Sequence, residues 1–254
     1  MKFKNKVVIV TGSTSGIGRA IAIKFSENGA TVIVSGRREV EGKKLENEII
    51  QNGGKCLFVP ADVSKEDDIK NLVNQTIHKF GKLDIAVNSA GISGDLFPVT
   101  EYPLDVWNQV IAINLTGVFL SMKYEIPEII KQGGGVVLNV SSALGLRGKE
   151  LVSAYSSSKH GVIGLTKCAA LEYGKYGIRV NAACFGGIET EMDQEFYKKS
   201  DNPEQLKKER LKSYALGRMG NVNEVANTSI WLCSDEASFI TGAAIPIDGG
   251  KTSK

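Results

Sequence analysis

A tyrosine and a lysine four residues apart, Tyr155 and Lys159, are the pair in this sequence whose types and spacing could do acid–base chemistry. They fall in a segment, about Val152 to Tyr173, that we predict to be a helix, and residues four apart lie on one face of a helix. A phenol normally keeps its proton to about pH 10, but an adjacent cation favours the phenolate. We therefore expect Lys159 to lower the pKa of Tyr155 so that the phenol exchanges protons near neutral pH. On spacing alone, an exposed helix that meets no substrate is an equal alternative.

Composition limits the kinds of protein that this chain can be. Its 254 residues suit one large α/β domain, and a net charge of +3 with 23% charged residues gives no reason to expect nucleic acid as a partner. The four cysteines form no C-x-x-C pair and there are two histidines, so we expect no metal site and a reduced, cytoplasmic protein. Apolar runs are too short for a signal peptide or a membrane span, so we expect no membrane partner.

Short apolar runs alternate with helical patterns along the whole chain. Strands are predicted at 7–10, 31–34, 56–59, 83–87, 136–140, 178–183 and 243–247, and helices from 17 to about 29, at 39–52, 66–80, 104–130 and 152–173. This order predicts a single-domain α/β fold, a doubly wound parallel sheet with helices on both faces. Because ligands bind at the carboxyl ends of such strands, Gly12, Asn88, Ser142 and Gly186, which follow four of them, should gather along one edge.

Three glycines, Gly12, Gly16 and Gly18, lie between the first strand and the first helix. Small residues there let the backbone approach a pyrophosphate, and the helix N-terminus supplies N–H donors, so the cluster favours dinucleotide binding over an empty turn. No G-K-[ST] follows the glycines, which argues against a P-loop, and Thr14 stands where a nucleophile elbow needs serine.

Taken together, these motifs resemble those of the short-chain dehydrogenase/reductase family over nearly the whole chain. Thr11-Gly12-x-x-x-Gly16-Ile17-Gly18 resembles the family's cofactor loop, Asp62 its adenine contact, and Asn88-Ser89-Ala90-Gly91 its N-N-A-G segment with one change. The family's catalytic quartet is matched by Asn114, Ser142, Tyr155 and Lys159, with the thirteen-residue step from serine to tyrosine kept.

The resemblance implies a Rossmann-type fold and an NAD(P)-dependent oxidoreductase that interconverts a secondary alcohol and a ketone. Tyr155 would be the acid/base and Ser142 would hold the substrate oxygen. Lys159 would bind the nicotinamide ribose and lower the pKa of Tyr155, and Asn114 would position a water that relays protons. It also implies a substrate lid at about 190–216 and a homotetramer. The implied cofactor-binding residues are Gly12, Ser15, Gly16, Ile17, Gly18, Arg37, Arg38, Asp62, Val63, Asn88, Ala90, Gly91, Tyr155, Lys159, Gly186, Ile188 and Thr190.

Two positions bear on how the cofactor is held. Phe185 replaces the proline that the family usually has before Gly186, so we expect a freer backbone there. The second strand ends in Gly36-Arg37-Arg38, where members that prefer NAD usually carry an acidic residue. Two arginines without a neighbouring carboxylate favour binding of the 2′-phosphate of NADP. NAD stays the alternative, because Ser15 lacks the basic character that the glycine loop has in many family members that use NADP.

Several alternatives stay open at the level of sequence. One alternative is a sensor or scaffold that binds a dinucleotide without catalysis, but such a protein has no use for the whole quartet. Another is a Ser/His hydrolase, which is disfavoured because neither histidine lies in a motif that would pair it with a serine nucleophile. His160 points about 100° away from Lys159 on a helix and is interpreted as structural. Arg147 and Lys149 either contact an anionic substrate or remain in solvent. The substrate is a ketone or secondary alcohol, with sugars or polyols, cyclic diols, steroids and 3-oxoacyl thioesters as the candidates.

Overall fold

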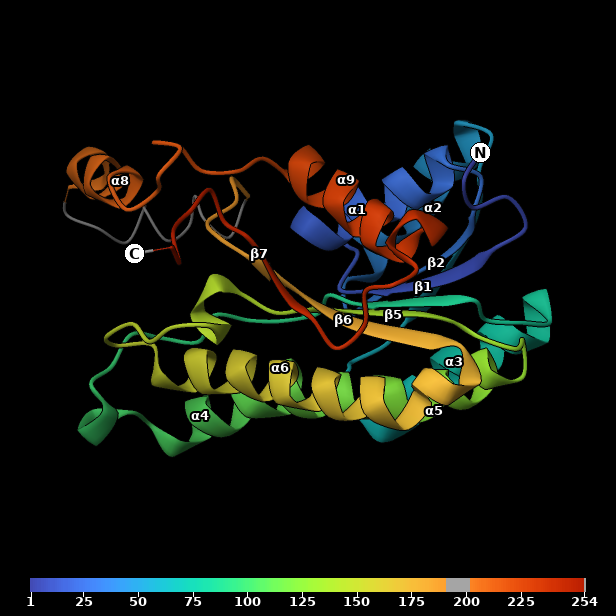
Figure 1. Cartoon of the computed structure of the whole chain (residues 1–254), viewed down its shortest axis with the longest axis horizontal. Helices are drawn as coiled ribbons and strands as arrows, with labels where there is room; N and C mark the ends of the chain where they lie inside the picture. Colours follow the sequence, from blue (N-terminus) through green and yellow to red (C-terminus); the bar gives the residue numbers. More distant parts are fainter. Residues whose placement is uncertain (191–201, 254) are drawn as a thin grey trace.

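The computed structural model describes residues 1–190 and 202–253, and it is built around a parallel β-sheet (Figure 1). The sheet has the strand order β3-β2-β1-β4-β5-β6-β7, and every neighbouring pair is parallel. The direction in which strands are added reverses between β1 and β4, which makes the carboxyl ends of these two strands the topological switch point. The strands are β1 (Val7–Thr11), β2 (Thr31–Gly36), β3 (Lys55–Pro60), β4 (Ile85–Asn88), β5 (Gly135–Val140), β6 (Ile178–Phe185) and β7 (Ala244–Ile247).

Helices cover both faces of the sheet, as the sequence predicts (Figure 1). One face carries α1 (Gly16–Glu27), α2 (Glu39–Gln51) and α9 (Val222–Cys233). The other carries α3 (Glu66–Phe80), α4 (Leu104–Ile111), α5 (Gly117–Ile130) and α6 (Ser153–Tyr173). Short 3₁₀ turns lie at η1 (Val99–Glu101), η3 (Ala143–Gly145), η4 (Gly174–Tyr176) and η5 (Asp235–Ala237), and α8 (Pro203–Leu211) lies at one end of the molecule.

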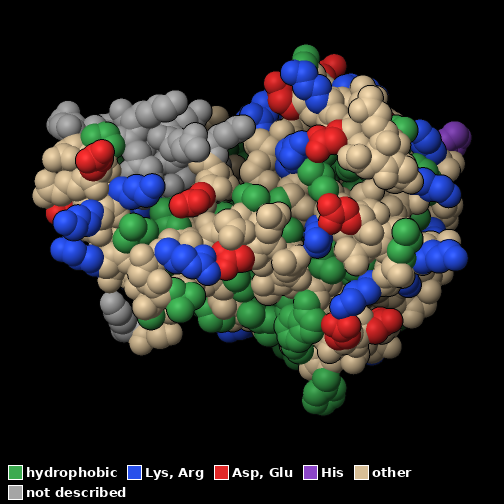
Figure 2. Space-filling view, turned by 90° about the horizontal axis from the view of Figure 1, so that it is seen from above, with side chains coloured by type: hydrophobic (Ala, Val, Ile, Leu, Met, Phe, Trp, Pro, Cys, Tyr) green, Lys and Arg blue, Asp and Glu red, His purple; other side chains and the backbone are tan. Residues whose placement is uncertain are grey.

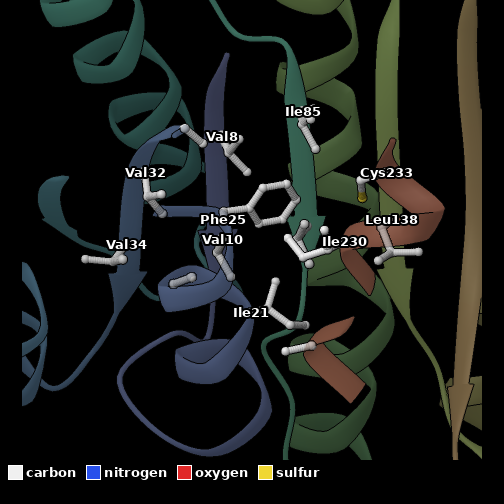
Figure 3. Close-up of a cluster of buried hydrophobic side chains, with 14 of the residues drawn as sticks. Val8, Val10, Ile21, Phe25, Val32, Val34, Ile85, Leu138, Ile230 and Cys233 are labelled. Atoms are coloured by element: carbon white, nitrogen blue, oxygen red, sulfur yellow. The ribbon is translucent and has the colours of Figure 1, made fainter. Parts of the chain in front are cut away.

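Alternating side chains of the buried strands build a separate core on each face. In β1, Val8 and Val10 point toward α1 and α9, where they pack around Phe25 and Ile230 (Figure 3). Ile9, one residue away, packs on the opposite face with the residues of α3 and α5. Because successive side chains of a strand point to opposite sides, apolar runs such as Val7–Val10 can fill both cores.

The helix predicted over 104–130 is interrupted. It begins as α4, passes through a π-helical turn, η2 (Ala112–Thr116), and continues as α5. The predicted quartet residue Asn114 lies inside that turn, and π turns often occur at functional sites. The helix α9 completes one face of the sheet and was not among the predicted helices.

Basic and acidic side chains are interspersed over the face shown in Figure 2, in keeping with the nearly balanced charge. Among the residues that the structure describes, no helix is both long enough and apolar enough to cross a membrane.

Candidate active site

The glycine loop lies at the switch point, directly between β1 and α1. Gly12 has a φ of +66°, and a Cβ placed on it would come within 2.6 Å of the Ala90 Cα in the loop after β4. The backbone conformation and the close approach therefore both require glycine at position 12. This contact brings the two loops of the switch point together, as the sequence predicts for residues that follow parallel strands.

A cleft of about 550 Å³ opens beside these loops. It is lined by most of the residues that the resemblance implies: Gly12, Ser15, Gly16, Ile17, Gly18, Arg37, Arg38, Asp62, Val63, Ala90, Gly91, Ser142, Tyr155, Lys159, Gly186 and Thr190. Several other lining residues were not among the predicted cofactor-binding residues: Thr14, Gly36, Ala61, Ser89, Ile92, Ile113, Val140, Ser141 and Phe185. Most of these are neighbours of predicted residues, so the strand-end rule could have found them.

Two predicted cofactor residues are directed into the protein interior instead of the cleft. The Asn88 side chain is buried and donates to Glu125 Oε2 and Asn139 Oδ1, both at 3.1 Å. Ile188 is buried in the core beside α9 and forms a β-bridge with Gly220. Both residues therefore support the cleft from behind.

The adenosine end of the predicted site is basic. Arg38 donates to the hydroxyls of Thr14 and Ser15, which fastens the end of β2 to the glycine loop. Burial alone would raise the pKa of Asp62, but hydrogen bonds from the Ser64 hydroxyl and N–H and the nearby Arg37 guanidinium together lower it. Asp62 is thus a carboxylate whose charge is already offset, next to two arginines that line the cleft.

The groups of the cleft fit a dinucleotide. Ser15 is the N-cap residue of α1, but its hydroxyl accepts a hydrogen bond from Arg38 and does not cap the helix. The first N–H groups of a helix have no intrahelical partner. Such N–H groups at a glycine turn suit a pyrophosphate. Asp62, the predicted adenine contact, lines the same cleft as Val63, Tyr155 and Lys159.

Tyr155, Lys159 and Ser142 converge at the far end of the cleft. α6 places the Lys159 ammonium 5.7 Å from the centroid of the Tyr155 ring, which confirms that the two side chains share a helix face. The Ser142 hydroxyl, at the end of β5, lies close enough to the phenol to lower its pKa. Lys159 is almost completely buried and donates to the Val140 carbonyl at 2.8 Å, so it is fixed against the same strand end.

The electrostatics of this pair differ from the sequence prediction. Burial raises the pKa of Tyr155 above its ordinary value, although the hydrogen bond from Ser142 acts in the opposite direction. Burial also lowers the pKa of Lys159 to about 8, against a smaller opposite effect of Cys184. The predicted lowering of the tyrosine pKa is therefore wrong for the chain by itself, because desolvation outweighs the lowering effect of Ser142 and Lys159 is not among the causes of the shift.

Asn114 acts as a bridge between segments. Its amide oxygen accepts from the Ile92 N–H at 2.8 Å, and its amide nitrogen donates to the Ile92 carbonyl at 2.9 Å and to Ser158 Oγ at 3.2 Å. Ser158 in turn donates to the Tyr155 carbonyl at 2.7 Å. Asn114 therefore links the loop after β4 to the turn of α6 that carries the phenol.

Other positions singled out in the sequence have structural surroundings. His160 is exposed and its Nδ1 lies 2.9 Å from the Ser156 carbonyl. Phe185 is a buried residue of β6. The next two backbone N–H groups donate hydrogen bonds of 3.0 Å, that of Gly186 to the Ile247 carbonyl and that of Gly187 to the Tyr214 phenol oxygen. Both N–H groups follow Phe185, so the expectation of a freer backbone before Gly186 stays a prediction. The predicted lid lies partly outside the described residues, at 191–201, and otherwise includes α8.

Comparisons with known proteins show similarity over nearly the whole chain. A family model described as enoyl-(acyl carrier protein) reductase matches residues 12–252. Cyclohexanol dehydrogenase of Acinetobacter sp. (strain SE19) is 40% identical over 253 residues, which cover 100% of this chain and 97% of that protein. The 2,5-dichloro-2,5-cyclohexadiene-1,4-diol dehydrogenase of Sphingobium indicum (strain UT26) is 40% identical over 97% of both chains.

Among solved structures, levodione reductase superimposes with a TM-score of 0.96 at 34% identity, covering 99% of each chain. The protein belongs to the short-chain dehydrogenase/reductase family. It is an oxidoreductase that acts on CH–OH groups, in a family that uses NAD(P), and the predicted family and fold class are confirmed.

Proposed function

We propose that this protein interconverts a small ketone and its secondary alcohol by hydride transfer with NADP, with Tyr155 as the acid/base. The observation that carries the proposal is the convergence of Tyr155, Ser142 and Lys159 at one end of a cleft whose other end suits a dinucleotide. NADP supplies the hydride chemistry when it is bound.

The roles of the side chains follow from their contacts. The phenol of half-buried Tyr155 keeps its proton and can donate it to a carbonyl oxygen, and the Ser142 hydroxyl beside it can hold that oxygen in place. Lys159, held by the Val140 carbonyl, brings an ammonium to the phenolate that forms after proton transfer. The proposal also includes the predicted role of Asn114 in proton relay. The hydrogen bonds from Asn114 to Ser158 and from Ser158 to the Tyr155 carbonyl support this role.

The preference for NADP is supported by Arg37 and Arg38, which line the cleft after β2. A guanidinium can bind a phosphate by charge-assisted hydrogen bonds, whereas an acidic residue there would repel it. NAD is the competing cofactor. Comparing kcat/KM with NADPH and with NADH decides between them, and a clear preference for NADH would refute this part of the proposal.

The catalytic role is tested with Tyr155→Phe. We expect reduction of a ketone panel to fall by a factor on the order of 10² to 10⁴, the usual contribution of a general acid, while the variant still binds NADPH in a fluorescence titration. Ordinary turnover by a folded Tyr155→Phe protein would contradict the assignment. Binding of NADPH without turnover of any ketone or alcohol by the unaltered protein would favour a sensor instead.

The substrate class is narrowed by the relatives. Two of them are named for alcohols on six-membered carbon rings, so cyclic alcohols and ketones head the panel, with sugars or polyols and 3-oxoacyl thioesters as competing classes.

The proposal includes a homotetramer in a reducing, cytoplasmic compartment. Apolar Leu104, Phe119 and Leu171 are exposed on α4, α5 and α6, the helices expected to pair between subunits, and the described cysteines are free thiols. Light scattering of the purified protein gives the oligomeric state, and a monomeric mass would refute the tetramer.

A further inference from the structure

One segment, residues 186–190, runs along the cleft from the end of β6 to the glycine loop, and we call it the crossing segment. It begins at Gly186, which lines the cleft together with Ser142 and Tyr155, and it ends at Thr190, which lines the same cleft. A Cβ placed on Gly16 would lie 3.7 Å from Thr190 Cγ2. Hydride transfer needs the nicotinamide ring close to a carbonyl group held by Tyr155 and Ser142. The crossing segment therefore lies beside the position that the chemistry requires of the ring.

Backbone hydrogen bonds hold two points of the crossing segment, and a side chain holds a third. The Gly187 carbonyl accepts from the Gly220 N–H at 3.1 Å, and the Glu189 N–H donates to the Gly220 carbonyl at 2.9 Å. The Gly187 N–H instead donates to the Tyr214 phenol oxygen at 3.0 Å. A Cβ on Gly187 would collide with this oxygen, so the contact requires glycine at that position.

The C-terminal tail, residues 248–253, contacts the same phenol. Lys251 Nζ donates to the Tyr214 oxygen at 3.0 Å and lies 4.3 Å from the centroid of the ring. The tail is fixed in turn, because the Leu216 N–H donates to the Gly249 carbonyl at 3.1 Å and the Asp248 carboxylate accepts from two N–H groups of the tail. The chain after β7 runs toward the end of the molecule that carries α8 (Figure 1). Lys251 is therefore joined to the crossing segment through one phenol oxygen.

This phenol oxygen is a stronger acceptor than that of an ordinary tyrosine. Tyr214 is buried, and burial alone would raise its pKa, but the hydrogen bond and charge of Lys251, the charge of Arg210 and the Gly187 N–H together lower it. Hydrogen bonds that involve an ionised group are shorter and stronger than those between neutral groups. Because the Lys251 ammonium draws negative charge onto the oxygen, it also strengthens the bond that this oxygen accepts from Gly187.

We propose that Tyr214 and Lys251 are positioning residues for the reaction: the phenol, polarised by the ammonium, fixes the crossing segment where the nicotinamide ring binds. This inference rests on the proposed function, because it needs a dinucleotide in the cleft, and it adds two residues from outside the cleft lining. One consequence separates this role from a general contribution to stability. A positioning role acts on binding of the nicotinamide ring and leaves binding of the adenosine half unchanged.

Nucleotides with and without the ring test the proposal. Dissociation constants are measured by titration calorimetry for NADPH and for 2′-phospho-ADP-ribose, which lacks nicotinamide, and in the same way for NADH and ADP-ribose. In Tyr214→Phe we expect the dissociation constant of the ring-bearing nucleotide to rise about three- to tenfold, the effect of one hydrogen bond, while that of its partner without the ring stays the same. Lys251→Met should give a smaller rise of the same kind, and Lys251→Arg, which keeps a donor, should bind as the unaltered protein does.

Amide hydrogen exchange of the protein without nucleotide gives a second readout that depends on no ligand. The Gly187 amide hydrogen should exchange about tenfold faster in Tyr214→Phe, because it loses its acceptor. The Glu189 amide hydrogen, which is bound to the Gly220 carbonyl, should keep its rate and serves as an internal comparison. Mass spectrometry with residue-level fragmentation measures both rates.

A second lysine–tyrosine pair provides matched controls. Lys175 Nζ lies 5.2 Å from the centroid of the Tyr176 ring, and both residues are exposed in η4, which precedes the amino end of β6. Tyr176→Phe and Lys175→Met should therefore change neither nucleotide affinity nor exchange at Gly187.

The outcomes separate this inference from the proposed function. An equal loss of affinity for nucleotides with and without the ring in Tyr214→Phe would overturn the positioning role and leave the oxidoreductase assignment intact. Unchanged affinity for all four nucleotides, or an unchanged exchange rate at Gly187, would overturn it as well. If the unaltered protein binds none of the four nucleotides, the proposed function itself fails, and this inference fails with it.

Discussion

A buried carboxyl group behind the active site gives a prediction that can be worked out numerically. Glu125 lies on α5 with only 1% of its surface exposed, and Asn88 Nδ2 donates to its Oε2 at 3.1 Å. Glu125 Oε1 and Asn88 Oδ1 have no hydrogen-bond partner among the described residues. Burial raises the pKa of Glu125 from 4.5 to about 7, against the smaller lowering effect of the Asn88 hydrogen bond.

The raised pKa makes folding stability depend on pH. Below pH 4.5, the folded and the unfolded chain both hold the proton, and the group has no differential effect. Between pH 4.5 and about 7, the unfolded chain releases the proton while the folded protein keeps it, so the free energy of unfolding falls as the pH rises. At about 1.4 kcal/mol for each pKa unit, the loss reaches about 3 kcal/mol above pH 7.

Glu125→Gln removes this titration and keeps the side chain's shape. The free energy of unfolding of the variant, relative to that of the unaltered protein, should rise by about 3 kcal/mol between pH 5 and pH 8. Urea unfolding at several pH values and one fixed protein concentration measures the difference. Glu128→Gln is the control, because Glu128 lies on the same helix in an ion pair with Lys131 near the surface, and its effect should stay below about 1 kcal/mol at every pH. Parallel pH curves for the unaltered protein and Glu125→Gln would refute the reasoning.

Three further perturbations test the cleft and its chemistry. Replacing Arg37 and Arg38 together by alanine should lower kcat/KM for NADPH about tenfold or more and change that for NADH little; an equal loss with both cofactors would argue against phosphate recognition. Gly12→Ala should destabilise the protein by about 1–3 kcal/mol in urea unfolding and weaken NADPH binding, because the added Cβ would lie 2.6 Å from the Ala90 Cα. An unchanged NADPH affinity in fluorescence titrations would contradict this prediction. Since the pKa of Tyr155 is raised above 10, alcohol oxidation, which needs the phenolate, should speed up from pH 7 to pH 10, while ketone reduction, which needs the protonated phenol, should change little; an oxidation optimum below pH 7 would exclude this assignment.

Local sequence patterns predicted the parts of the site that depend on local geometry. The spacing of Tyr155 and Lys159 determines their shared helix face, and the position of Gly12 between strand and helix determines its turn. The strand order β3-β2-β1-β4 makes these elements meet, and the alternation of strands and helices was enough to predict a parallel sheet.

Features that depend on distant contacts were not accessible from the sequence. The π turn at Asn114 comes with a bridge to Ile92, 22 residues away, and Ala112–Thr116 carries no residue that would break an ordinary α-helix. The fixed backbone at Gly187 depends on Tyr214, 27 residues further on. The pKa of Tyr155 depends on burial by the whole fold, so the spacing of the pair gave the wrong direction.

The end of β5 fixes the reacting groups from the sheet side. The Val140 carbonyl holds the Lys159 ammonium at 2.8 Å, and the Ser141 hydroxyl donates to the Lys159 carbonyl at 2.9 Å. Ser142, the next residue, lies close enough to the Tyr155 phenol to lower its pKa. Val140 and Ser141 thus hold the side chain and the backbone of Lys159, so the geometry of this part of α6 is established by folding. A substrate therefore needs only to place its carbonyl oxygen against groups that are already in position.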